Sequence, residues 1–562
     1  MRITRARSPF SGTWRRARAP LGRRHARVDS NERVGGVGAS SGFSVPVLDV
    51  GHLGPYGVWN FYGLADLGGD GMSESGRSTL GGKRKLTLVD ATAQSVGLMG
   101  PVFSIAFLVP LVVGITSATG NGAGTAAPLA VVIGAVGVLG LGWIIAEYSR
   151  RIHSAGSLYD YVTDGLGGRI GSAAGWLYYT GILALGAGIL PMIGGTIHDT
   201  LQGEFNLTPL PYLGWDIVLL VVVGLVIHMG VTISTRTQLI LALVSFSVVG
   251  VFSLVVIARS GGLHHVTQGF SPSGSSTGWR GVMFGVLYGV LLFTGFETAA
   301  NLGEETERPE RNIPRAVLTA VLAVSAFYVI GSFAQVAGFH FSLHALGNAA
   351  QAGPLFVLAG PGSAGGFGGV ALRRIVELVV VLDMLAVLVG TAVAASRGIF
   401  ALSRDERLPR VLSGVSRRGT PFGASNFTLV TYAVIIAAVQ WFHWFALPKT
   451  PEYVSMFSWM STYGGFAIVV IYLLISVGAL RGLRDHAKWW AVVVAALVGI
   501  AVTVAAVYGS IYKVGAPTKW APYSALIILA VGVAASFAMR PIPSGQSDFS
   551  ALKSSEQGPV KL

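Results

Sequence analysis

Long apolar runs separated by short polar segments make up most of the chain from about residue 88 onward. Each run has about 18 or more residues with few charges, enough for a helix to cross roughly 30 Å of hydrocarbon. The pattern therefore predicts an all-α membrane protein with twelve transmembrane helices. The predicted spans lie near 88–116, 127–147, 168–194, 215–233, 237–258, 281–302, 315–339, 372–400, 425–446, 455–479, 489–511 and 521–540.

Two of these predicted helices are interrupted near their middle, in SVGLMGPVFS (95–104) of the first and FTGFET (293–298) of the sixth. A proline lacks a backbone N–H and disfavours helix at the residue before it. Transporters built from inverted repeats have such breaks in corresponding helices, and the substrate lies at them. If five helices form one repeat, the first and sixth correspond, which predicts a 5+5 inverted-repeat core with broken first and sixth helices plus two extra helices.

A broken membrane helix leaves backbone groups that only a cavity or a ligand can accommodate. The half-helix after the first break offers N–H groups and a positive dipole end, which suit a carboxylate. Carbonyls freed at the sixth-span break suit an ammonium group, so the two breaks would hold a zwitterion. Ordinary glycine packing is the alternative. The candidate substrate-binding residues are Gly97, Leu98, Met99, Gly100, Pro101, Phe293, Thr294, Gly295 and Phe296.

Charge and composition exclude several other classes of protein. Only 12% of residues are charged, against roughly a quarter in soluble domains. The net charge of +14 does not indicate nucleic-acid binding, because the basic residues lie in residues 1–71 and in short loops. The absence of cysteine excludes disulfides and cysteine metal sites. Lys and Arg are concentrated in the loops on one side of the predicted spans, which predicts a multi-pass plasma-membrane protein with both termini in the cytoplasm.

The chain divides into four predicted regions. Residues 1–85 form a disordered basic cytoplasmic tail, or translation starts at Met72 and residues 1–71 are not part of the protein. Residues 86–480 form the ten-helix transport core, and 481–540 form two accessory transmembrane helices. Residues 541–562 form a cytoplasmic C-terminal tail.

Three stretches resemble the bacterial amino acid permeases of the amino acid–polyamine–organocation superfamily. They are FTGFETAANLGEETERPERNIPRAV (293–317), AEYSRRIHSAGSLYDYV (146–162) and AASRGIFALSRDERLP (394–409). The resemblance, over roughly residues 85–540, implies secondary transport of amino acids or related amines by alternating access. The family's first break is usually a run of small residues such as G-S-G. This chain has Leu98 and Met99 there, which would narrow the pocket or shift its substrate preference.

Four residues within the spans are candidates for ion coupling. Glu297 either orients the broken sixth helix or carries a transported proton, and Asp383 attracts a cationic substrate, relays protons or makes a polar contact between helices. Ser245 and Thr391 either supply oxygen ligands to a sodium ion or bond to their own helix. The coupling ion, proton or sodium, stays open, and no other cofactor or metal is predicted.

Charged residues near the cytoplasmic ends of the spans are candidates for an inner gate. We predict a network of Glu147, Arg397, Arg404 and Asp405 with Glu304 and Glu305, and not one critical bridge, because exposed ion pairs contribute little individually. The predicted function is ion-coupled import of an amino acid, with a proton favoured as the ion, and the sequence does not identify which amino acid. The alternatives are an amine or polyamine transporter, an amino acid exchanger and a membrane sensor that does not transport. No nucleophile–base or metal pair of an enzyme is evident, the partners are the substrate and the lipid bilayer, and no oligomeric state is predicted.

Overall fold

The computed structural model describes residue 80 and residues 85–115, 122–350, 352–446, 450–512 and 516–539. Within these ranges the chain is helical, and strand-like pairing is confined to the isolated bridges Leu86–Thr306 and Pro361–Gly368. The predicted all-α class is confirmed. Nearly all of the predicted N-terminal tail, the alternative start at Met72 and the C-terminal tail lie outside the described residues.

Eleven helical segments of the described residues are long and apolar enough to cross a membrane. The first is made of α1 (Leu88–Met99), α2 (Pro101–Phe103), the π-helix η2 (Ser104–Leu108) and α3 (Val109–Val113). The sixth predicted span is α10 (Trp279–Leu291) followed by the 3-10 helix η6 (Phe296–Glu305). The others are α4 (Ala127–Ser149), α6 (Gly168–Phe205), α8 (Val231–Arg259), α11 (Pro309–Gly338), α14 (Val370–Arg404), α15 (Phe422–Phe442), α16 (Glu452–Gly482), α17 (Trp489–Ile511) and α18 (Trp520–Ala538).

The remaining predicted span is the shorter apolar helix α7 (Tyr212–His228). Short helices lie in the connections: η3 (Gly124–Ala126), α5 (Leu158–Leu166), η4 (Gly262–His265), α9 (Val266–Gly269), η5 (Pro272–Gly274), α12 (Leu343–Asn348), α13 (Pro354–Ala359), η7 (Gly362–Ala364) and η8 (Arg410–Ser413).

Two predicted boundaries are wrong. The third span continues past residue 194 to Phe205, through Pro191, which a membrane helix tolerates. The loop predicted at 234–236 lies inside α8, where the Thr235 hydroxyl bonds to the Val231 carbonyl of its own helix at 3.1 Å. The chain turns instead at Gly230, whose φ of 120° lies in a region that favours glycine.

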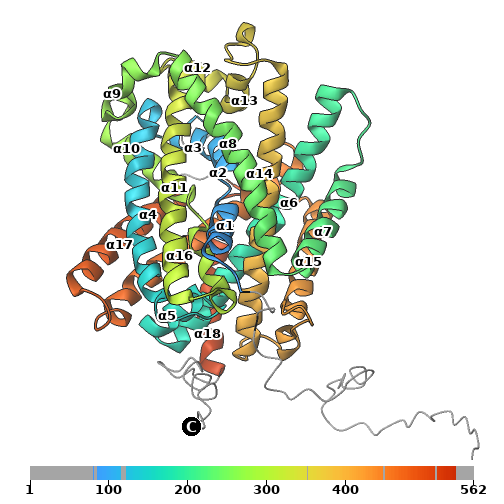
Figure 1. Cartoon of the computed structure of the whole chain (residues 1–562), viewed down its shortest axis with the longest axis vertical. Helices are drawn as coiled ribbons and strands as arrows, with labels where there is room; N and C mark the ends of the chain where they lie inside the picture. Colours follow the sequence, from blue (N-terminus) through green and yellow to red (C-terminus); the bar gives the residue numbers. More distant parts are fainter. Residues whose placement is uncertain are drawn as a thin grey trace, which may run out of the picture. The chain divides into compact units, whose positions relative to one another are not determined.

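Burial separates inner spans from outer spans. In α1–α3, α6, α10–η6, α14 and α16 the most apolar window is 78% buried, against 33% in α17 and 28% in α18. Large apolar side chains on the outer helices face outward, among them Val251, Leu497 and Ile527. In Figure 1 α1 lies among α8, α11 and α14, with which it is in contact. This arrangement places both interrupted helices in the protein interior and leaves the outer helices to face lipid.

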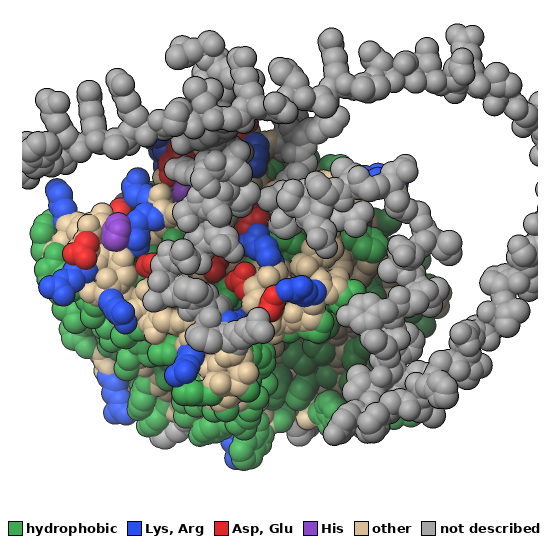
Figure 2. Space-filling view, turned by 90° about the horizontal axis from the view of Figure 1, so that it is seen from below, with side chains coloured by type: hydrophobic (Ala, Val, Ile, Leu, Met, Phe, Trp, Pro, Cys, Tyr) green, Lys and Arg blue, Asp and Glu red, His purple; other side chains and the backbone are tan. Residues whose placement is uncertain are grey.

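The face seen in Figure 2 carries many Lys, Arg, Asp and Glu side chains, whereas the flanks visible beside it are largely hydrophobic. Small residues let the inner helices approach closely. A Cβ on Gly464 of α16 would lie 2.7 Å from the Gly181 carbonyl oxygen of α6. Such close backbone contact is typical of helices packed in lipid.

Candidate functional site

The first span breaks where its sequence predicts. Thr87 and Asp90 form a capping box at the start of α1, and α1 ends at Met99. Gly100 then takes the left-handed conformation, with φ 54°, and Pro101 begins the second half-helix. A Cβ on Gly100 would lie 2.4 Å from Val387 of α14, so both the backbone conformation and the space require glycine.

The sixth span breaks between α10 and η6. Helix α10 ends at Leu291, and Gly295 takes φ 108° before η6 begins at Phe296. The intervening N–H groups of Phe293 and Thr294 bond to carbonyls three residues back in α10. Gly295 therefore provides a backbone conformation that other residues adopt only with strain.

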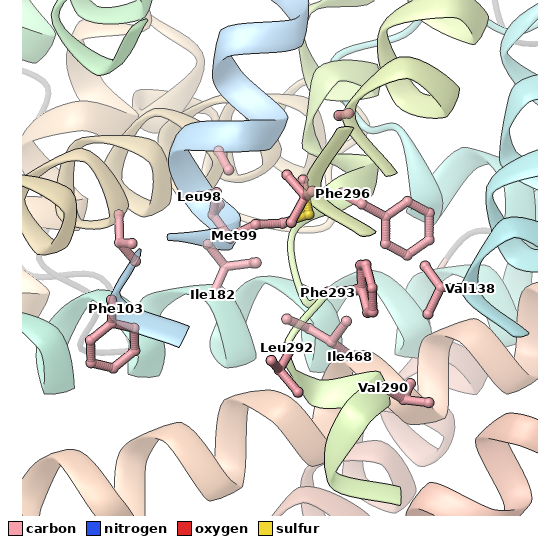
Figure 3. Packing of buried hydrophobic residues seen from close by; sticks show 14 of the residues in the cluster. Leu98, Met99, Phe103, Val138, Ile182, Val290, Leu292, Phe293, Phe296 and Ile468 are labelled. Atoms are coloured by element: carbon pink, nitrogen blue, oxygen red, sulfur yellow. The ribbon is translucent and has the colours of Figure 1, made fainter. Parts of the chain in front are cut away.

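The two breaks are in direct contact. A Cβ on Gly295 would lie 2.1 Å from Cδ2 of Leu98. The Ser95 hydroxyl donates to the Phe296 carbonyl at 2.6 Å and accepts from the Ala299 N–H at 3.0 Å. In Figure 3 Leu98 and Met99 face the segment that carries Phe293 and Phe296, and all four side chains are buried. Apolar side chains therefore fill the space between the breaks, and this conformation is closed there.

Glu297 is fully buried just after the sixth-span break. Its carboxylate accepts hydrogen bonds from the Tyr178 hydroxyl of α6 at 2.9 Å and the Tyr472 hydroxyl of α16 at 2.5 Å. It also accepts from the Gly295 N–H at 3.2 Å. The carboxylate thus ties the break to two inner helices, which accounts for the orienting role. The proton-carrying role stays a prediction.

Asp383 of α14 contacts the first break. Its Oδ2 accepts the N–H groups of Val102 at 3.0 Å and Phe103 at 2.8 Å. These are N–H groups that the sequence predicted would be free for a substrate carboxylate, so that expectation is wrong for this conformation. Arg373 and Arg374, which lie nearer the start of α14, pair with other carboxylates. Those partners are Glu204 and Glu377.

Ser245 and Thr391 do not share a site. The Ser245 hydroxyl bonds to the carbonyls of Leu241 and of Val379 on α14, both at 2.8 Å. The Thr391 hydroxyl bonds to the Leu388 carbonyl of its own helix at 2.9 Å. Val379 and Thr391 are about 18 Å apart along α14 at ~1.5 Å per residue. One sodium ion cannot be bound by both hydroxyls in this conformation.

Three of the four predicted gate residues lie in one cluster of charges. Arg397 makes a two-pronged pair with Glu305, at 2.7 and 3.2 Å, with both side chains at most 3% exposed. Arg404 lies 2.9 Å from Glu304, and the Tyr159 hydroxyl donates to Asp405 at 3.0 Å. The sequence predicts a network of solvent-exposed ion pairs, but the Arg397–Glu305 pair at its centre is buried. Glu147 forms a separate exposed pair with Arg150.

A family model described as amino acid permease matches residues 86–533. The chain belongs to the amino acid permease family. The match covers the predicted core and most of the two accessory helices, and the family is one of permeases and not of enzymes.

Curated relatives of this permease are distant. A branched-chain amino acid permease of Lactococcus lactis is 24% identical over 52% of this chain and 64% of its own length. Its counterpart of the same name in Bacillus subtilis is 26% identical over 63% of this chain and 74% of its own length. A lysine-specific permease of L. lactis is 25% identical over 53% of this chain and 60% of its own length. The matches thus span less than two thirds of both L. lactis relatives.

Among solved structures, a manganese transporter of Eremococcus coleocola in complex with an aromatic bis-isothiourea substituted compound aligns with 80% of this chain and 93% of its own. The TM-score is 0.48 and the sequence identity is 13%.

Several residues of the permease's site were missed from the sequence. The Gln94 amide donates to the Gly390 carbonyl and accepts from Gln238, which joins α1, α8 and α14. The Tyr328 hydroxyl donates to the Leu292 carbonyl at 2.6 Å, and so satisfies a group freed by the sixth-span break. A glutamine inside an apolar run is a detectable signal of such a role. A tyrosine is not, because tyrosines are common at membrane interfaces.

The charged cluster makes a pH-dependent contribution to stability that can be measured. The pKa of Asp160 in α5 is raised from 3.8 to about 7. Burial is the largest cause, the charge of Asp405 adds to it, and Ser154 and Arg404 oppose it. The folded protein therefore holds a proton that the unfolded chain loses, and its stability falls as pH rises from about 4 to about 7. We expect the melting temperature in detergent to drop between pH 5 and pH 8, with a smaller drop in Asp160→Asn.

Burial also raises the pKa of Asp405, so the variant keeps part of the effect. Glu147→Gln, which alters an exposed pair outside the cluster, serves as the control and should keep the full drop. An Asp160→Asn protein with the same pH dependence as the parent would contradict this assignment.

Proposed function

We propose that this permease imports an amino acid across the cytoplasmic membrane by alternating access, coupled to a proton. The observation that carries the proposal is the contact between the two broken helices, where Leu98 packs on Gly295 in the protein interior. Broken helices in corresponding positions are where transporters of inverted-repeat design bind substrate. Separation of the breaks on one side, and then on the other, would open this space in turn to the two sides of the membrane.

A proton suits the described residues better than a sodium ion. Ser245 and Thr391 lie too far apart to share an ion. Glu297, in contrast, is a buried carboxylate at the break, and its hydrogen bonds reach two inner helices. A change in its protonation would alter contacts that hold the break in place, which is one way to link a proton to a conformational change.

The side chains at the breaks favour an apolar substrate side chain. Leu98, Met99 and Phe293 are apolar and buried between the half-helices. Two of the relatives are named for branched-chain amino acids and one for lysine. Leucine is therefore the first substrate to test, with lysine as the second.

The test is uptake of labelled leucine and lysine into liposomes that contain the purified protein. We expect saturable accumulation with an inward proton gradient and none with a sodium gradient alone. Glu297→Gln should lower the rate by about tenfold or more, because loss of a hydrogen bond to a charged group costs about 1.5–3 kcal/mol and ~1.4 kcal/mol is tenfold. Entry only into preloaded liposomes would indicate an exchanger. Binding without any flux would favour a sensor and overturn the proposal.

A further inference from the structure

Asp383 is the buried carboxylate at the first break whose hydrogen bonds are incomplete. Its Oδ2 accepts both N–H groups at the start of the second half-helix. Its Oδ1 is buried and has no hydrogen-bond partner among the described residues. The carboxylate faces the break itself, because a Cβ on Gly100 would lie 3.4 Å from Oδ2.

The half-helix that Asp383 caps is longer than α2 alone. Helix α2 continues through η2 into α3, so the helical backbone runs from Pro101 to Val113. Its N–H groups stabilise the negative charge on Oδ2. A buried carboxylate oxygen left without a donor is unfavourable, so a ligand that brings a donor to Oδ1 gains free energy.

A second carboxylate at the same place would be disfavoured. The substrate carboxylate would compete with Asp383 for the N–H groups of Val102 and Phe103, and two like charges would meet in a low dielectric. An ammonium group has the opposite sign and brings donors only. The group that this site lacks is therefore a cation with N–H donors.

We propose that Oδ1 of Asp383 binds the ammonium group of the substrate when the two breaks separate. The inference rests on the proposed function and names the substrate group that this part of the site selects. It reverses the orientation expected from sequence, in which the first break would take the carboxylate. The ammonium group is then required for binding, and an amine of the same side chain without a carboxylate also binds.

The experiment is competition against labelled leucine on the full-length protein in detergent. The competitors are leucine, 3-methylbutylamine, which keeps the ammonium group, and 4-methylpentanoate, which keeps the carboxylate. We expect the amine to compete within about tenfold of leucine and the carboxylate not to compete at a hundredfold higher concentration. Asp383→Asn should weaken binding of both leucine and the amine by about tenfold or more.

The asparagine variant separates ligand binding from capping, because its carbonyl oxygen can still accept the N–H groups of the half-helix. The matched control is Asp216→Asn, which alters another buried aspartate, bonded to Gln440 and away from the breaks. Both variants should retain a similar melting temperature, and the control should retain leucine affinity.

The outcomes distinguish the inference from the proposed function. If leucine binds and Asp383→Asn binds it as tightly as the parent, or if 4-methylpentanoate competes better than the amine, the inference is wrong and amino acid binding stands. If labelled 3-methylbutylamine binds in an Asp383-dependent way but no amino acid does, the inference stands and the proposed function fails. If no probe binds, both are overturned.

Discussion

Arg397→Gln and Glu305→Gln are each expected to lower the free energy of unfolding by about 3–5 kcal/mol, because each leaves one charge buried without its partner. The pair is two-pronged and almost fully excluded from solvent. It joins the last turns of α14 to the end of η6, whose Glu305 carbonyl also accepts the N–H of Leu86 just before α1. Either variant should melt at a markedly lower temperature in detergent and lose uptake.

The double variant Arg397→Gln/Glu305→Gln tests the reason for this effect. It removes both charges, so it should be more stable than either single variant, since the cost comes from the unpaired charge and not from the missing attraction. Glu147→Gln is the matched control, because the Glu147–Arg150 pair is solvent-exposed and contributes ~0–1 kcal/mol. If Glu305→Gln melted at the same temperature as Glu147→Gln, the buried pair would not stabilise this end of the helices.

The apolar helices long enough to cross a membrane could be predicted from the sequence, because lipid imposes a length and a composition on every span. The breaks could be predicted as well, since GLMGP (97–101) and FTGFET (293–298) cannot continue a helix without distortion. Local rules of this kind also indicated Glu297 and Asp383, because a carboxylate within an apolar run needs a partner.

The partners themselves could not be predicted, because they come from distant parts of the chain. The sequence does not show that Asp383 meets Val102 or that Glu297 meets Tyr472, since these contacts depend on how helices rotate and cross. The same limit applies to the gate cluster. The sequence predicts Arg397 as one member of a gate network, but it does not show that the packing of α14 against η6 buries this arginine with Glu305. Solvent exposure depends on how the helices pack, so the sequence could not show that the Arg397–Glu305 pair is buried whereas the Glu147–Arg150 pair is exposed.

Gly295→Ala is expected to abolish uptake and to destabilise the fold, for two separable reasons. The added Cβ would lie 2.1 Å from Cδ2 of Leu98, so one of the two breaks must shift. The φ of 108° is also strained for alanine, at a cost of about 1–3 kcal/mol. Uptake in liposomes and melting temperature in detergent measure the two effects together.

Two further variants separate the contact from the backbone strain. Gly230→Ala adds a Cβ at φ 120° with nothing within 4 Å, so it reports the strain alone and should lower the melting temperature less. In Leu98→Ala/Gly295→Ala the colliding Cδ2 is gone, although the Leu98 Cβ position still lies 3.2 Å away. This double variant should recover part of the stability that Gly295→Ala loses, but not all of it, because the backbone strain at residue 295 remains. If the double variant were no more stable than Gly295→Ala, the close packing of the two breaks would not be what makes glycine necessary at this position.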